Sequence, residues 1–223
     1  MQGSTTGQQL LDQARADLTE VERSIREHPF LAALESGRAP RTSLEALAGE
    51  QDRVIASDRR SFAQLAARFP HEPAGAFFLS MAEGEGLALG LLQEFASALG
   101  VDQAWLAAYE PSPDCHAYPS YVAWLALNGS STDVALAFLA NLAAWGANCG
   151  RVADALRQHY GFDDAAVAFF TFFASPPPGF EQRALAVIDA GLAAGDDPAS
   201  AHRATRLLQA YELRFWDGMA AVS

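Results

Sequence analysis

Apolar residues recur along the chain with the spacing of helices that bury one face. In the first segment, Leu11, Leu18 and Ile25 fall on one side of a helix. Alanine and leucine dominate, β-branched residues are sparse, and no stretch alternates with a period of two. The pattern predicts an all-α protein without a sheet, so any ligand site has to lie between helices.

Proline and glycine divide this pattern into segments. We expect helices over about residues 5–27, 43–68, 75–99, 102–109, 121–127, 132–160, 163–174, 180–193 and 198–221. The stretch EPSPDCHAYPS, residues 110–120, is expected to be a loop, and SPPPGF a hinge. The chain has 223 residues, of which 50% are hydrophobic. This is enough for one core, so we predict a single domain over residues 1–223.

The net charge limits the classes of partner that the protein can bind, and the cysteine content indicates its compartment. The formal net charge is −12, from 15 basic and 27 acidic residues. A nucleic-acid-binding protein needs a basic surface to displace counterions from phosphates, so we expect no nucleic-acid partner. Two cysteines, Cys115 and Cys149, are too few for a disulfide scaffold and fit a reducing cytoplasm. Cys149 is expected to be a buried free thiol.

Signals for export or membrane insertion are not evident in the sequence. The N-terminal stretch MQGSTTGQQLLDQARAD has no basic region followed by an apolar run. The longest apolar stretch, VALAFLANLAAWGANCG, is shorter than a membrane span. We therefore expect a cytoplasmic protein that does not associate with a membrane.

One acidic residue interrupts the apolar stripe of the last helix. Leu208, Glu212, Phe215 and Met219 follow the spacing of one helical face. A buried carboxylate costs several kcal/mol unless it is paired or hydrogen-bonded. Glu212 is therefore the first candidate for a functional side chain.

Further polar residues fall on apolar stripes of other helices. Gln51 and Asp58 lie on the buried side of the helix over 43–68, and Asp52 lies at its edge. Such an acid is more often part of a salt bridge between helices, and Asp58 beside Arg59 and Arg60 suits that interpretation. Glu85, in MAEGEG, fits a packing role or a site equally well, and Asn141 and Asn148 lie on or near the apolar face of the long helix. The five histidines fall in loops or at helix ends, where we expect them to be exposed.

Common catalytic motifs are missing. The sequence has no P-loop, nucleophile elbow, GxGxxG, HExxH or CxxC pattern. We therefore expect neither a cofactor nor a metal ion.

Four stretches, in this order, resemble the TenA (thiaminase II) family: HPFLAALESG, GEQDRVIASDRRSFAQLAARF, PSPDCHAYPSYVAWLALNG and YELRFWDGMA. The resemblance covers nearly the whole chain. It implies the haem-oxygenase-like all-α fold, which the family shares with the oxidase of PQQ synthesis. Combined with the punctuation of the chain, it predicts a bundle of about seven to nine helices.

The resemblance also implies a site. Enzymes of the family hydrolyse thiamine or an aminomethyl-pyrimidine at the exocyclic carbon. By the matching motifs, Asp52 contacts the pyrimidine ring, Tyr118 assists and Glu212 transfers a proton. The remaining pocket residues are expected to be Gln51, Ile55, Glu85, Asn141, Trp145, Tyr211, Phe215 and Trp216.

The chain departs from the family at its nucleophile. Asn141 or Leu142, in FLANLAAWGANCG, takes the place of the family's cysteine, and Cys149 lies about two turns too late. Two tyrosines of the family pocket fall here on Ile55 and Gly146. The chain is more similar to a branch of the family that lacks the cysteine and acts on aminopyrimidine breakdown products with acids alone.

We therefore predict a cofactor-free hydrolase whose substrate is an aminopyrimidine or another small heterocycle. Two alternatives stay open. An iron-dependent oxidase is one, since relatives of this fold carry di-iron sites, although Ala88 stands where a ligand histidine would follow Glu85. A non-catalytic binder, or a diverged natural-product enzyme of the same fold, is the other.

The aromatic content indicates an assembly. Trp105, Tyr109, Trp124 and the FFTFF run exceed what a small bundle needs inside, and aromatic residues are enriched at interfaces. Relatives of this fold form dimers and tetramers. We expect a homodimer or homotetramer.

Overall fold

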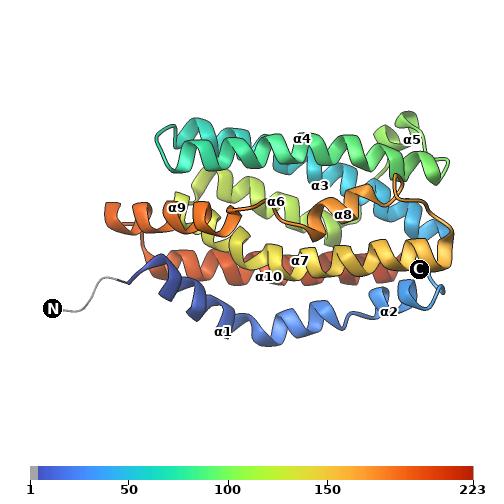
Figure 1. Cartoon of the computed structure of the whole chain (residues 1–223), viewed down its shortest axis with the longest axis horizontal. Coiled ribbons are helices and arrows are strands. Elements are labelled where there is room, and N and C mark those ends of the chain that lie inside the picture. The colour runs from blue at the N-terminus through green and yellow to red at the C-terminus, as the bar shows by residue number, and fades with distance from the viewer. Residues whose placement is uncertain (1–4, 223) are drawn as a thin grey trace.

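The computed structural model describes residues 5–222, which form ten α-helices and no strand (Figure 1). The helices are α1 (Gly7–Arg26), α2 (Pro29–Glu35), α3 (Arg41–Arg68), α4 (Ala74–Ala98), α5 (Gln103–Ala108), α6 (Pro113–Asn128), α7 (Ser131–Tyr160), α8 (Ala168–Ala174), α9 (Phe180–Ala194) and α10 (Pro198–Ala221). The all-α prediction is confirmed. Residues 1–4 and 223 of the predicted domain, including the start of the N-terminal stretch, lie outside the described residues.

Two proline-containing segments fold as helices where we expected none. Pro29 occupies the first turn of α2, and the His28 side chain accepts a hydrogen bond from the backbone N–H of Phe30. Pro113 starts α6 in the same way, and the Ser112 hydroxyl accepts from the N–H of Cys115. Proline is tolerated in a first turn because its missing N–H has no partner there. The loop predicted over 110–120 is therefore wrong from residue 113 on, although residues 110–112 lie outside any helix. The α2 helix brings the number of helices in the described residues above the expected seven to nine.

The helices pack in layers, and the long helices run side by side with their neighbours (Figure 1). The α3 helix packs along α4 on one side and against α6 on the other. The α10 helix lies between α6, α7 and α1. Helices α8 and α9 pack on α7 and also touch α4. The side chains of α3, α4, α6, α7 and α10 are thereby brought to one interior region.

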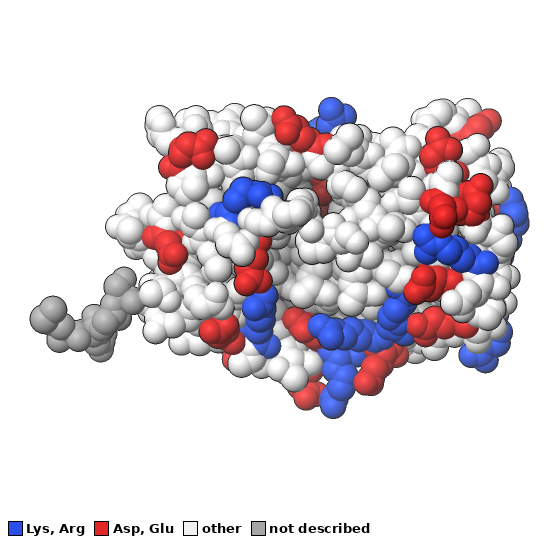
Figure 2. All heavy atoms as spheres, viewed as in Figure 1, with Lys and Arg blue, Asp and Glu red and all other residues white. Residues whose placement is uncertain are grey.

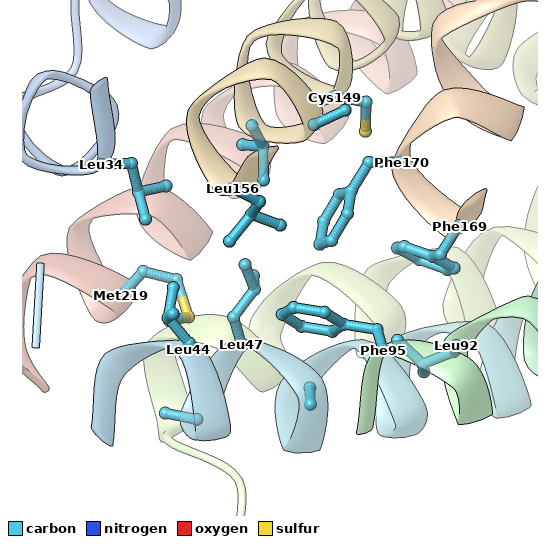
Figure 3. Close-up of a cluster of buried hydrophobic side chains, with 14 of the residues drawn as sticks. Leu34, Leu44, Leu47, Leu92, Phe95, Cys149, Leu156, Phe169, Phe170 and Met219 are labelled. Atoms are coloured by element: carbon cyan, nitrogen blue, oxygen red, sulfur yellow. The ribbon is translucent and has the colours of Figure 1, made fainter. Parts of the chain in front are cut away.

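Apolar side chains fill the end of the bundle where α3, α4, α7 and α8 meet. Figure 3 shows Leu47 and Phe95 facing Leu156 and Phe170 across this cluster. The ring centroids of Phe95 and Phe170 are 5.1 Å apart in an edge-to-face arrangement. Burying a side chain of this size contributes about 1.5–3 kcal/mol. Cys149 lies in the same cluster as a buried free thiol, as predicted.

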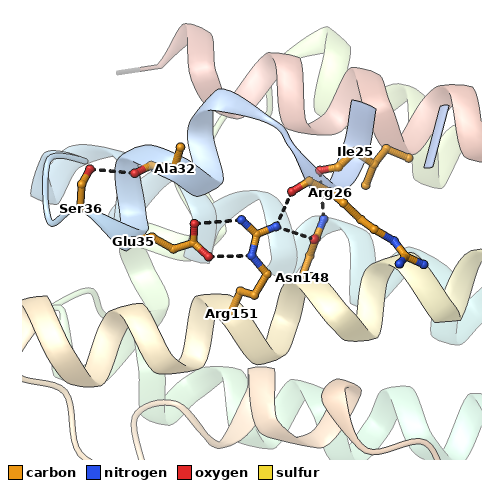
Figure 4. A network of polar contacts seen from close by, with 7 residues as sticks. All are labelled: Ile25, Arg26, Ala32, Glu35, Ser36, Asn148 and Arg151. Atoms are coloured by element: carbon orange, nitrogen blue, oxygen red, sulfur yellow. Dashed lines mark hydrogen bonds and ion pairs between the residues drawn. The ribbon is translucent and has the colours of Figure 1, made fainter. Parts of the chain in front are cut away.

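Hydrogen bonds and an ion pair connect the junction of α1 and α2 to α7 (Figure 4). The Arg151 guanidinium makes a two-pronged ion pair with Glu35, at 2.6 and 2.9 Å, and also donates to the carbonyl of Arg26. The Asn148 amide donates to the carbonyl of Ile25 at 3.3 Å. Asn148, which the sequence placed on or near an apolar stripe, therefore donates to a free carbonyl group at the C-terminal end of α1 and does not face a ligand.

Of the described helices, α4 alone is long and apolar enough to cross a membrane by length and composition. Its mean hydropathy over 18 residues is 1.2, and 28% of that window is buried. The same test is passed by core helices of proteins that never enter a bilayer, and α4 packs along α3. It is weak evidence for a membrane span.

Candidate functional site

A cavity of about 260 Å³ lies between α3, α4, α6, α7, α8 and α10. Most of its wall is apolar, with ten side chains from these helices and from α9: Val54, Ile55, Met81, Phe138, Leu142, Trp145, Phe172, Phe173, Phe180 and Phe215. Eight polar side chains also reach it: Gln51, Asp58, Ser80, Glu85, Tyr118, Asn141, Arg183 and Glu212. A mainly apolar cavity with a few converging polar groups is the usual form of a small-molecule site.

Glu212 enters the cavity wall from α10 with only 2% of its surface exposed. The indole N–H of Trp216, one turn later, donates to Oε1 at 3.2 Å. The Asn141 amide from α7 donates to Oε2. Burial raises the pKa of Glu212 to about 8, although these two hydrogen bonds act in the opposite direction. The carboxyl group is therefore protonated at neutral pH and is held in one orientation.

Asn141 connects Glu212 to two further polar groups. Its amide also donates to Gln209 Oε1 at 3.1 Å, and its Oδ1 accepts from the Tyr118 hydroxyl at 3.2 Å. The pKa of Tyr118 is raised well above its usual value, first by burial and then by the carboxyl groups of Asp58, Glu212 and Glu85. Tyr118 thus stays a neutral donor, and its bond fixes which way the Asn141 amide points.

Acidic groups from α3 and α4 also meet at the cavity. Asp58 is 3% exposed, and its Oδ1 atom has no hydrogen-bond partner in the described structure. The Oε2 atom of Glu85 is buried without a partner as well. Burial raises the pKa of both carboxyl groups, and the neighbouring Asp58 raises that of Glu85 further. Burial thus favours the protonated form of both.

The salt bridge expected for Asp58 is wrong. Within residues 5–222 it pairs with neither Arg59 nor Arg60. Successive side chains on a helix point about 100° apart, so both arginines face away from the stripe that buries Asp58. Arg59 lies over Gly86 of α4 instead, where a Cβ atom on that residue would be 3.3 Å from its guanidinium carbon.

The structure brings most of the predicted site together. Glu212 and Tyr118 line the cavity together with six of the eight predicted pocket residues: Gln51, Ile55, Glu85, Asn141, Trp145 and Phe215. Their roles in binding and catalysis stay predictions. The pocket tyrosine of the family that falls on Gly146 has no counterpart in the cavity wall, because Gly146 packs against the backbone of Phe173.

Three predicted residues lie elsewhere, and the predicted site is corrected accordingly. Asp52 is not in the cavity wall. A shift of one residue from Gln51 turns its side chain by about 100° around the helix, and its Oδ2 atom lies 4.0 Å from Nη1 of Arg53. Tyr211 packs on Tyr121, with ring centroids 5.1 Å apart, outside the cavity. Trp216 is buried behind Glu212, so it supports that carboxyl group without reaching the cavity itself.

Sequence reasoning missed several residues of the wall. Phe172 and Phe173 come from the FFTFF run, which we had assigned to an interface, and Arg183 comes from the first turns of α9. The sequence placed Asp58 on a buried stripe, but we interpreted it as part of a salt bridge between helices. Asp58 and Gln51 are two turns apart on one face, and both reach the cavity, whereas Asp52 is turned by about 100° from Gln51. Which phase of α3 faces a cavity depends on the neighbouring helices, so no local signal marks it.

Donors for a metal ion or haem do not gather at this cavity. No histidine lines it, and in the described part of the chain no group of three or more His, Cys, Asp or Glu side chains is arranged to hold a metal ion. His28, which we expected to be exposed, is buried as the cap of α2, with Nε2 3.2 Å from Asp217. The residues present therefore do not fit the iron site or the axial ligand that the fold family could imply.

Comparisons with known proteins agree with this fold. A model of the TENA/THI-4/PQQC family matches residues 15–221. A TenA homologue from P. horikoshii has a TM-score of 0.78 at 18% identity, over 96% of this chain and 99% of the other.

More distant structures share the architecture. A putative TenA-like thiaminase from Sulfolobus solfataricus has a TM-score of 0.63 at 15% identity, over 94% of this chain and 96% of the other. A haem oxygenase from the cyanobacterium Synechocystis, in complex with haem, has a TM-score of 0.70 at 15% identity, over 96% of this chain and 92% of the other. No curated protein sequence gives a significant match.

Proposed function

The chain belongs to the TENA/THI-4/PQQC family, and from this premise we propose that it hydrolyses a small aminopyrimidine with Glu212 as the proton-transfer group. The observation that carries the proposal is the position of Glu212: buried, oriented by Asn141 and Trp216, and part of a cavity wall. Similarity to a putative TenA-like thiaminase supports the class of reaction.

The chemistry follows from the protonation of Glu212. With its pKa near 8, the carboxyl group carries a proton at neutral pH and acts as a general acid. It donates this proton to the amine that leaves the exocyclic carbon, and the C–N bond breaks as the oxygen of a water molecule bonds to the same carbon. The water then returns a proton to the carboxylate. The products are an alcohol and ammonia, and the enzyme is restored.

Water is the nucleophile in this scheme, because no thiol is available. Neither Cys115 nor Cys149 lines the cavity, and burial raises the pKa of both thiols. Leu142 and Asn141 occupy the relevant stretch of α7. Asn141 and Tyr118 act as positioning residues, since they hold Glu212 through a chain of hydrogen bonds.

The size of the cavity favours a single ring. A cavity of about 150 Å³ accepts benzene, so 260 Å³ leaves room for one substituted heterocycle. Trp145 and Phe215, with ring centroids 6.2 Å apart, and Phe173 give it flat aromatic walls. An aminopyrimidine breakdown product therefore fits better than intact thiamine, which has two linked rings.

Turnover of 4-amino-5-aminomethyl-2-methylpyrimidine tests the proposal. We expect the purified protein to release ammonia and the 5-hydroxymethyl product, identified by mass spectrometry. Glu212→Gln should lower kcat by about 100-fold or more, which is typical of losing a general acid. Tyr211→Phe is the matched control, since Tyr211 is on the same helix and outside the cavity. A folded wild-type protein without turnover above buffer would end this proposal.

A non-catalytic small-molecule binder is the second candidate. The observation in its favour is that no cysteine is among the residues that line the cavity. Native mass spectrometry of the freshly purified protein distinguishes the two: a binder retains a stoichiometric ligand that it does not convert.

A further inference from the structure

We propose that Asp58, Glu85 and Gln51 form a subsite for a cationic nitrogen group of the ligand, an ammonium or an amidinium, and that the carboxyl pair releases a proton when this cation binds. The inference rests on the proposed function only in taking the same cavity as the ligand site. Binding at the subsite does not require that the ligand is turned over.

The subsite offers acceptors without partners. Asp58 Oδ1, Glu85 Oε2 and Gln51 Oε1 are all buried and lack a hydrogen-bond partner in the described structure. Gln51 and Asp58, on α3, are 1% and 3% exposed, and both line the cavity. Leaving a buried acceptor unsatisfied costs about 1–3 kcal/mol. Three unpartnered acceptors among the residues that line one cavity are unusual for a packing region and indicate a ligand that brings several N–H donors.

No protein cation occupies this position. Arg183 of α9 lines the cavity, but its guanidinium donates to the carbonyl of Pro178 at 3.0 Å. Arg59 of α3 lies over Gly86. Within residues 5–222 neither arginine forms an ion pair with Asp58 or Glu85.

The other elements around the pair add no positive charge either. Tyr118 from α6 is neutral, Glu212 from α10 is a further acid, and α8 contributes phenylalanine rings. The carboxyl pair thus has a place for a positive charge that residues 5–222 do not fill.

Proton release follows from the environment of the empty site. Burial raises the pKa values of Asp58 and Glu85 above their usual range and so favours the protonated form of both. A cation placed against the pair favours the ionised form and lowers these pKa values. Binding of a permanently cationic ligand therefore displaces a proton, and its affinity rises as pH rises.

The same arrangement distinguishes ligands by charge. A neutral ring of equal shape can stack on Phe172 and Phe173 but offers too few donors for the three acceptors. Discrimination by unpaired buried polar groups is larger than discrimination by apolar contact. The edge of an aminopyrimidine is an amidine, which matches the subsite when the ring is protonated.

Benzamidine and benzamide make a matched pair of probes, because they share size and shape and differ in charge. Isothermal titration calorimetry with the wild-type protein should give about tenfold or more tighter binding for benzamidine. Repeating the titration in phosphate and in Tris should show net proton release, and the affinity should rise with pH. Equal affinities, no binding of benzamidine, or no released proton would each overturn the inference.

Variants locate the effect. Asp58→Asn and Glu85→Gln should each weaken benzamidine binding by about tenfold or more while leaving that of benzamide little changed. Glu83→Gln, an exposed neighbour on α4, is the matched control and should bind both probes as the wild type does. Unchanged benzamidine binding in both cavity variants, with circular dichroism showing intact helices, would contradict the assignment.

The outcome is separable from that of the proposed function. Glu212→Gln should keep its preference for benzamidine even though it loses turnover. A wild-type protein that prefers benzamidine through Asp58 and Glu85 but shows no turnover supports the subsite and refutes the hydrolase. Turnover without any charge preference does the reverse.

Discussion

The carboxyl group of Glu212 shows how one residue takes its properties from its surroundings. Tyr211 and Trp216 are both aromatic and close to it in sequence, yet Trp216 donates a hydrogen bond to it, whereas Tyr211 packs on Tyr121 of α6. Burial sets the direction of its pKa, and two donors limit the shift. The protonation of Glu212, Asp58 and Glu85 should therefore be visible in the stability of the protein.

Stability should fall as pH rises through the range in which Glu212 titrates. Its pKa is 4.5 in the usual environment and about 8 in the folded protein, so the folded state binds more protons than the unfolded state between these values. The free energy of unfolding then decreases with pH in this window, and Asp58 and Glu85 act in the same direction. Urea denaturation at a series of pH values measures the slope.

The variant Glu212→Gln is the control for this slope, because it keeps the shape and removes the titrating group. Its free energy of unfolding should gain on that of the wild type as pH rises from 4.5 to about 8. Parallel curves for the two proteins would show that Glu212 ionises in the folded protein as it does in water.

The hydrogen bond from the Asn141 amide should lower the pKa of Glu212. Replacing Asn141 by leucine removes this hydrogen bond, so the pKa should rise further. If Glu212 is the general acid, the alkaline limb of the kcat profile moves to higher pH, and kcat falls by about tenfold through lost orientation. An unchanged limb would separate Asn141 from the protonation of Glu212.

At the scale of the element, a glycine in α7 sets how closely α8 packs at the cavity. Gly146 is buried, and a Cβ atom there would lie 2.9 Å from the backbone oxygen of Phe173. This close approach lets the end of α8 lie against α7, and it positions Phe172 and Phe173 as part of the cavity wall.

Gly146→Ala should therefore move α8 and lower the free energy of unfolding by about 1–3 kcal/mol, the usual cost of overpacking. Gly90→Ala in α4 is the matched control, because a Cβ atom there meets nothing within 4 Å. That change should stabilise the protein by up to about 1 kcal/mol through helix propensity. Chemical denaturation of both variants gives the comparison, and equal effects would contradict the close contact.

At the scale of the whole molecule, apolar surface remains uncovered. Figure 2 shows one face on which uncharged side chains cover most of the surface, with charged ones scattered between them. Trp124 on α6 is 53% exposed, and its ring stacks on Tyr121, which touches Tyr211 of α10. On α4, Leu79 and Leu87 are 52% and 65% exposed. The FFTFF run, in contrast, is used inside the bundle.

A homodimer or homotetramer stays a prediction, now resting on these exposed residues. Analytical ultracentrifugation should show a species of two or four 23.8 kDa chains. Trp124→Arg should dissociate it if the α6 and α10 aromatic residues form the contact, because a charge would be buried there. Sedimentation of the wild type as a monomer at micromolar concentration would refute the assembly.

The sequence by itself determined the helices and the principal acid. The 3.6-residue period, the caps and the glycine stops are local, so they set nine of the helices approximately, and the apolar stripe of α10 was enough to single out Glu212. It failed where proline was taken only as a breaker, since a proline in the first turn starts α2 and α6.

Only the tertiary structure decided which acid of α3 reaches the cavity. The buried face of α3 is wide, because α4 and α6 cover it from two sides, and its stripe therefore does not distinguish Asp58 from Asp52 by sequence. A shift of one residue turns a side chain by about 100°, and the phase of a helix is set by its neighbours. The cavity itself is formed between helices that are far apart in the sequence, so no local pattern records it.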